Sequence, residues 1–280
     1  MKSMDNALYN IISNIIRVFV VSTISFVITG ILVRELGDEL YGIVPLITSF
    51  NRYVILVTVV LTASAGRFVS LSYFEDKLLE SNQYYSTSFF GLLLISIIVF
   101  IVFYIFSFYL DGYFNFPIKY FAEVKTFFVL SVLALLFSSL MSIFNVPVFI
   151  KHSFYLNDLV SIISKTSLLI LVYFFIENIT LVWFGFSLLI SSFISLSISY
   201  LISIKLISGL RINIKYFSLP KLKEMGVMGL NAFINSLGII LYTSSDIIIV
   251  NILLGSFESG RYGIAVQCGI VVSLLGGSVT

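Results

Sequence analysis

The sequence contains little charge, cysteine or histidine. Only 11% of its 280 residues are charged, which is less than half of the roughly 25% usual in a soluble domain. A single cysteine (Cys268) and a single histidine (His152) exclude a disulfide framework and a metal site with several Cys or His ligands. No G-x-x-x-x-G-K segment is present to hold nucleotide phosphates, and a net charge of +2 is too small to favour nucleic acid as a partner. The sequence therefore predicts no cofactor, no metal and no nucleic-acid partner.

Apolar residues make up most of what is present. They account for 59% of the chain, and the mean hydropathy is +1.09. A soluble core of this size could not bury so much apolar surface with so few polar residues to cover it. We therefore predict an all-α polytopic membrane protein, which leaves a transporter, a channel, a scaffold or a lipid-processing enzyme as the classes of function.

Eight segments are long and apolar enough to cross the hydrocarbon core as helices, which takes about 20 residues each. They are 8–33, 41–65, 87–110, 127–150, 157–176, 180–204, 226–254 and 262–280. The longest predicted connections are 66–86 and 205–225, so we expect no extramembrane domain among the connections. The predicted function is therefore carried out inside the bilayer or at its two faces.

The distribution of cations in the connections predicts the orientation. One side would hold Lys2, Arg67, Lys77, Lys151, Lys205, Arg211, Lys215, Lys221 and Lys223, and the other side Arg34, Lys119, Lys125 and Arg261. Because cytoplasmic loops carry the excess of Lys and Arg, this favours a cytoplasmic N-terminus. The connection 205–225 interleaves basic and apolar residues, as expected of a segment lying on an anionic leaflet. Ordinary positive-inside bias explains the same pattern and is the simpler interpretation.

A short internal repeat relates the two ends of the chain. A long span, a glycine turn at Gly37 and the sequence Tyr41-Gly-Ile are matched by a long span, Gly255 and Tyr262-Gly-Ile, with three extra residues in the second copy. The copies lie six spans apart, as in parallel repeats that form two bundles around a cavity. We predict a six-helix bundle over 1–208, followed by a linker and the first two helices of a second bundle over 209–280. We also expect the chain to be truncated, lacking about four spans.

Three cations and one acid lie within the predicted spans. They are Arg17, Arg52, Lys165 and Asp246. A cation facing lipid at a helix centre costs roughly 2.5–3.5 kcal/mol, so these residues should face the protein interior. Other polar residues share their helix faces at steps of three or four, chiefly Asn14 in the first span, Asn51 in the second, and Asn235 and Tyr242 in the seventh. These stripes predict a water-filled cavity between the helices.

Each of these charges also has an ordinary structural interpretation. Arg17 and Lys165 each lie about nine residues into their predicted spans and could extend to the interface. Arg52 is too deep for that, so the cavity is the stronger interpretation for it. Asp246 could neutralise an arginine as readily as it could couple transport to an ion. The excess of cations favours an anionic cargo, and arginine binds phosphate oxygens in a forked geometry. A phosphate-bearing, lipid-linked molecule is the predicted cargo.

Two stretches carry a resemblance to a known family. The first is Gly30-Ile-Leu-Val-Arg-Glu-Leu-Gly-Asp-Glu-Leu-Tyr41-Gly-Ile, with Thr48-Ser-Phe-Asn-Arg52-Tyr and Ala65-Gly-Arg67-Phe-Val-Ser. The second is Asp246-Ile-Ile-Ile-Val-Asn-Ile-Leu-Leu-Gly255, then Gly260-Arg-Tyr-Gly-Ile-Ala-Val-Gln267. Both resemble bacterial O-antigen type lipid-linked oligosaccharide flippases, the polysaccharide exporters of the multidrug/oligosaccharidyl-lipid/polysaccharide exporter superfamily.

The resemblance implies a transporter rather than an enzyme, with two pseudo-symmetric bundles that work by alternating access. It implies an undecaprenyl-pyrophosphate-linked repeat unit as the substrate, moved across the bacterial inner membrane for O-antigen, capsule or exopolysaccharide synthesis. Polysaccharide polymerase machinery is then a potential partner. By this resemblance, Arg17, Arg52 and Lys165 would bind the pyrophosphate. Asp246 would couple transport to an ion or orient an arginine. Eight spans instead of the family's twelve or more leave in doubt whether this chain alone closes a transport path.

Two other functions are left open. A multidrug antiporter of the same superfamily would need cavity acids for cationic drugs, and the excess of cations argues against it. A membrane-embedded polysaccharide polymerase or ligase would need sizeable outer loops and cavity acids or histidine for its chemistry. Here the predicted outer loops are short, and the predicted spans contain no histidine. No motif reveals which sugars would be carried.

Overall fold

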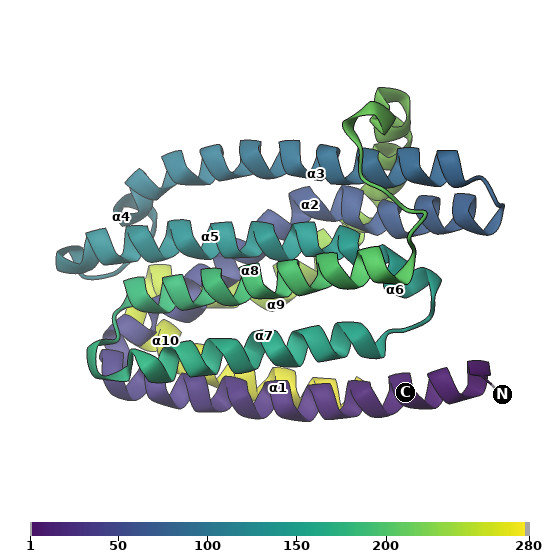
Figure 1. The fold of residues 1–280 in the computed structure, drawn as a ribbon. Helices are drawn as coiled ribbons and strands as arrows, with labels where there is room; N and C mark the ends of the chain where they lie inside the picture. The colour runs from purple at the N-terminus through teal and green to yellow at the C-terminus, as the bar shows by residue number, and fades with distance from the viewer. Residues whose placement is uncertain (1, 278–280) are drawn as a thin grey trace.

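The computed structural model describes residues 2–277, with side chains over residues 8–269, and this part of the chain is helical without strands. Its helices are α1 (Lys2–Tyr41), α2 (Ile43–Phe74), α3 (Leu78–Phe106), α4 (Leu110–Tyr113), α5 (Phe121–Phe144), α6 (Val146–Ile150), α7 (Tyr155–Phe174), α8 (Leu181–Leu206), α9 (Leu219–Leu254) and α10 (Ser256–Gly277). Most of them lie along one long axis, and α2 and α9 cross the others obliquely (Figure 1). The predicted all-α bundle is confirmed.

Seven stretches of the described chain are long and apolar enough to cross a membrane. They coincide with the first seven predicted spans. The eighth predicted span falls on α10, a helix of 22 residues, and its last three residues lie outside the described part of the chain.

Two predicted connections are wrong in extent. The predicted connection 66–86 is mostly helix, because α2 continues to Phe74 and α3 begins at Leu78. The predicted connection 205–225 shortens in the same way, since α8 ends at Leu206 and α9 begins at Leu219. Hydropathy reports the thickness of the hydrocarbon core, whereas these helices extend beyond it through polar residues that still favour helix.

The packing order explains how the bundle encloses space. α1 packs against α7, α7 against α8, and α8 against α5, while α2 packs against α5 and α3. α9 lies along α2, and α10 contacts α1, α2 and α9. We call the end that holds the α1–α2 turn the Tyr41 end, and the opposite end the N-terminal end. One buried apolar cluster is centred on α5 residues such as Phe127 and Phe128, and a second includes Tyr85 and Met225.

Both predicted glycine turns of the repeat are present. Gly37 breaks the helical path of α1 with φ of 75°, and Gly255 separates α9 from α10 with φ of 91°. Left-handed backbone of this kind favours glycine over residues with a Cβ. The two turns therefore bend the chain in the same way at matching places, one before α2 and the other before α10.

Candidate functional site

A cavity of about 470 Å³ lies in the half of the bundle nearer the Tyr41 end. Residues of α1, α2, α7, α8, α9 and α10 line it, and they include two cations, Arg52 and Lys165. The other polar lining groups are Ser22, Ser25, Thr29, Tyr41, Thr48, Ser49 and Gln267. The remaining walls are mainly apolar, with Ile28, Leu168 and Phe184 among them. The volume is within the range usual for a small-molecule site, about 300–1,000 Å³.

The two cavity cations are not neutralised by any side chain that the structure describes. Within the described part of the chain, neither Arg52 nor Lys165 forms a salt bridge or a side-chain hydrogen bond. None of the lining residues, all of them described, is acidic. Two unpaired positive charges beside apolar walls create a positive potential that attracts an anion. The arrangement is thus suited to hold a phosphate or carboxylate, with hydroxyl and amide groups close by.

A side-chain bond across the cavity ties α1 to α10. Thr29 Oγ1 donates to Gln267 Oε1 over 2.8 Å. Gln267 ends one of the stretches that carry the family resemblance but is not among the predicted site residues, although a polar amide in an apolar part of a predicted span indicates an interior position.

Arg17 is not in this cavity. Its Nε lies 2.7 Å from Asp158 Oδ1 on α7, and Ser13 Oγ donates to the other oxygen of the same carboxylate over 2.5 Å. Asn14 Oδ1 also accepts a hydrogen bond from Arg17. Hence Arg17 and Asn14, both predicted to face a cavity, lie at the contact between α1 and α7 instead.

A second polar anchor lies one turn earlier on α1. Asn10 Nδ2 donates to the His152 carbonyl over 2.9 Å, and its Oδ1 accepts from the Tyr155 N–H over 3.0 Å. The side chain therefore satisfies a backbone group at the start of α7. We call Asn10, Ser13, Arg17 and Asp158 the α1–α7 latch.

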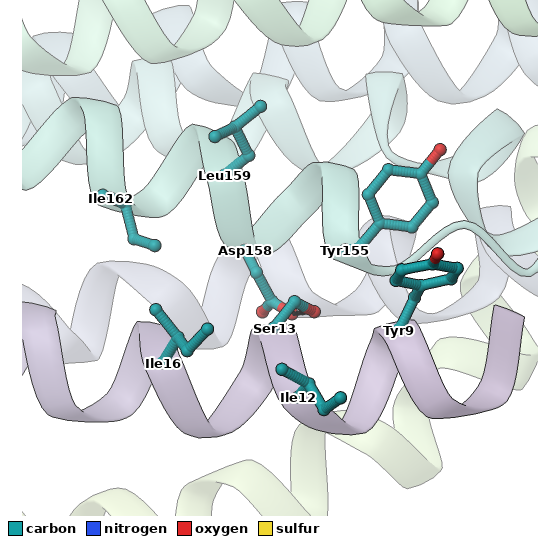
Figure 2. A pocket seen from close by; sticks show the side chains of 8 residues that line it. All are labelled: Tyr9, Ile12, Ser13, Ile16, Tyr155, Asp158, Leu159 and Ile162. Atoms are coloured by element: carbon teal, nitrogen blue, oxygen red, sulfur yellow. Dashed lines mark hydrogen bonds between the residues drawn. The ribbon is translucent and has the colours of Figure 1, made fainter. Parts of the chain in front are cut away.

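The latch borders an apolar groove of about 540 Å³. Figure 2 shows Ser13 and Asp158 meeting between the two helices, with Ile12, Ile16, Leu159 and Ile162 around them. Ile12 and Ile16 lie on roughly the opposite side of α1 from the cavity-lining residues Ser25 and Leu32. The groove and the cavity are therefore separate features on two faces of α1.

The other predicted polar residues lie outside the cavity as well. Asn51 is buried and donates to Ser131 Oγ of α5 over 2.7 Å. Asn235 and Tyr242 are exposed on α9, Tyr242 to 84%. Asp246, also exposed, accepts a hydrogen bond from the Tyr262 hydroxyl over 3.1 Å. Of the eight predicted site residues, the structure places only Arg52 and Lys165 at the cavity.

Close contacts hold the end of α9 and the start of α10 in place at the Tyr41 end. Asn251 of α9 accepts from the Asn115 N–H over 3.0 Å and donates to the Asn115 carbonyl over 3.2 Å. Ser259 Oγ of α10 lies 3.1 Å from the Gly42 carbonyl. A Cβ placed on Gly42 would overlap the Ser256 carbonyl. The start of α2 and the start of α10 thus meet backbone to backbone.

The Asn251 contact yields a prediction on stability. Asn251→Leu should lower the free energy of unfolding by about 1–3 kcal/mol, because two hydrogen bonds between the fully buried Asn251 side chain and the Asn115 backbone are lost. Thermal unfolding in detergent measures this. Asn115→Ala is the control, since the bonds use its backbone and should survive the substitution. Equal destabilisation by the two variants would contradict the assigned role of the Asn251 side chain.

The comparisons with known proteins identify the family. The family model described as "Polysaccharide biosynthesis protein" matches residues 7–279. The chain belongs to the polysaccharide biosynthesis protein family. It is 25% identical over 283 residues to "Uncharacterized membrane protein EpsK" of Bacillus subtilis (strain 168), a match that covers 100% of this chain and 55% of that protein.

Solved transporters share the fold. The MATE multidrug transporter DinF-BH superposes with a TM-score of 0.74 at 18% identity, covering 94% of this chain and 60% of that one. An inward-facing multidrug resistance MATE family transporter of the MOP superfamily gives 0.72 at 15% identity, covering 95% and 63%. The chain therefore has the fold of these MATE transporters, and its apolar helices make it a multi-pass membrane protein. It spans little more than half the length of the curated relative.

Proposed function

We propose that this protein moves a lipid-linked saccharide, joined to its lipid through a diphosphate, across the bacterial inner membrane. The observation that carries the proposal is a pair of cations, Arg52 and Lys165, that no described residue neutralises, in a cavity that also presents hydroxyl and amide groups. The diphosphate would bind the two cations, and the hydroxyl and amide groups would bind sugar. Membership of the polysaccharide biosynthesis family supports the saccharide part of the proposal.

The proposal includes the substrate, orientation and partner expected from the sequence. The lipid carrier would be undecaprenyl pyrophosphate and the saccharide an O-antigen or similar repeat unit. The N-terminus would be cytoplasmic, and polysaccharide polymerase machinery would be a partner. Arg17 has a carboxylate partner, so we assign it to the α1–α7 contact and leave diphosphate binding to Arg52 and Lys165.

The cavity charges provide the test. In vesicles holding the natural protein, Arg52→Ala and Lys165→Ala should each lower translocation of a diphosphate-linked saccharide about tenfold or more, because each removes a charge-assisted contact. Arg52→Lys should retain part of the activity, since it keeps the charge but loses the forked geometry. Lys119→Ala, at an exposed position, is the matched control. Wild-type translocation by both cavity variants, at normal protein levels, would overturn the proposal.

Export of cationic drugs is the second candidate, because the solved MATE neighbours include multidrug transporters. A cavity lined by two cations and no acid disfavours it. A strain deleted for the gene separates the two functions. Loss of surface polysaccharide with lipid-linked units held inside supports saccharide transport, whereas drug sensitivity with normal surface polysaccharide supports drug export.

A further inference from the structure

The connection between α8 and α9 is a fixed strap rather than a loose loop. Its residues 207–218 lie across the first turns of α3 (Figure 1). Three polar side chains of α3 bind the backbone of the strap there. The bonds are Asn82 Nδ2 to the Gly209 carbonyl (3.1 Å), the Arg211 N–H to Asn82 Oδ1 (2.7 Å), Ser86 Oγ to the Arg211 carbonyl (3.2 Å), the Asn213 N–H to Ser86 Oγ (3.1 Å) and the Ser218 N–H to Thr87 Oγ1 (3.0 Å). The path of the strap is thus set by side chains of another helix.

This strap and its two flanks present cations that bind nothing in the described protein. Lys205, Arg211, Lys215 and Lys223 are exposed, and their side chains form no salt bridge or hydrogen bond with any described residue. Lys221 behaves differently. Its ammonium donates to Glu80 over 2.9 Å and lies 3.7 Å from the centre of the Tyr84 ring. The unpaired cations are therefore those on the strap's free side and flanks, and the inward one is neutralised.

Apolar side chains are exposed among these cations. Ile214 is 62% exposed and Leu219 69% exposed. A surface of basic residues with apolar side chains between them suits the boundary between lipid headgroups and acyl chains. Its charge complements the anionic phospholipids of a cytoplasmic leaflet.

We propose that the strap is a binding surface for anionic phospholipid headgroups, formed by Lys205, Arg211, Lys215 and Lys223, with Ile214 and Leu219 entering the acyl region. Positive-inside bias alone would need only the charges. Here α3 also holds the backbone that carries them, so little ordering is needed on binding. Because the strap leads directly into α9, which packs along α2, bound lipid would hold the start of α9 at the membrane surface.

A local fluorescent reporter tests the proposal in the natural protein. Ile214→Trp, in a Trp183→Phe background that removes the chain's one tryptophan, places the reporter within the strap. Quenching by brominated phosphatidylglycerol relative to brominated phosphatidylcholine gives the local preference for anionic lipid. Ile118→Trp, 76% exposed at the Tyr41 end, is the matched control reporter.

The Ile214→Trp reporter should show a clear preference for phosphatidylglycerol that high salt weakens, and the Ile118→Trp reporter should show little. Replacing Arg211, Lys215 and Lys223 with glutamine should reduce the preference by about fivefold for each cation removed. The same change at Arg34, Lys119 and Arg261 should leave it intact. No preference at Ile214→Trp, or an equal loss in both triple variants, would overturn the proposal and would favour an acidic protein as the partner of the strap.

The result is independent of transport. Loss of the lipid preference with saccharide translocation intact would refute the strap proposal only. A preserved lipid preference with no effect of either Arg52→Ala or Lys165→Ala on translocation would refute the proposed function only.

Discussion

Gly42→Ala should destabilise the protein by about 1–3 kcal/mol, although it adds only one methyl group. The backbone at Gly42 has φ of −57° and ψ of −23°, a conformation that alanine adopts without strain. The cost is therefore steric. The new Cβ would overlap the Ser256 carbonyl. The backbones are also close at Gly260, where an added Cβ would lie 2.9 Å from Gly42 Cα. Backbone atoms cannot turn away as a side chain would, so the starts of α2 and α10 must separate.

Gly66→Ala is the matched control, because it makes the same substitution within α2. A Cβ on Gly66 would meet nothing within 4 Å, and alanine favours helix over glycine by about 1 kcal/mol. Gly66→Ala should thus unfold at the wild-type temperature or slightly above it. The unfolding midpoint in detergent and the monodisperse fraction on size exclusion measure both variants. Equal midpoints for Gly42→Ala and wild type would show that the backbone contact between α2 and α10 is absent in solution.

The close approach at Gly42 also shows what sequence reasoning could reach. The repeat predicted glycine turns at Gly37 and Gly255, because a short motif and the local backbone conformation are linked directly. It could not predict that the start of α2 would press against Ser256, since this contact joins residues far apart in the chain. The helices themselves were predictable from apolar length, and their ends were less so, because helix continues past the hydrocarbon core.

The candidate site was likewise predictable in its local features but not in its contacts between helices. Helical spacing placed polar residues on one face of a helix, but it could not say which neighbour would cover that face. Arg52 and Lys165 meet at the cavity, whereas Arg17 is paired with Asp158, and Asn51 is bonded to Ser131. Asp158 lies at the start of the predicted span 157–176, where an acid is expected to face water. Only the three-dimensional packing of α1 against α7 reveals it as a partner.

Asp158→Ala should give the second large effect, a loss of about 3 kcal/mol or more in the free energy of unfolding. The Asp158 side chain is 13% exposed, and it holds both Arg17 and Ser13. Removing one member of a buried ion pair costs about 3–5 kcal/mol, and because the Arg17 side chain is 30% exposed we expect a loss at the lower end of this range. The double variant Arg17→Leu/Asp158→Leu should be more stable than Asp158→Ala, because no unpaired charge is left between the helices.

Chemical or thermal unfolding of Arg17→Leu, Asp158→Leu and the double variant Arg17→Leu/Asp158→Leu forms a double-mutant cycle that isolates the pair. Glu75→Ala is the control, since it breaks the ion pair with Lys77, whose partners are both well exposed and contribute little. If Asp158→Ala behaved like Glu75→Ala, the α1–α7 latch would contribute no stability. If the double variant were less stable than Asp158→Ala, the effect would come from packing. If Asp158→Ala is unstable and the double variant regains stability, the uncompensated charge of Arg17 is the cause. Pairing with Asp158 of α7 would then be the structural role of Arg17.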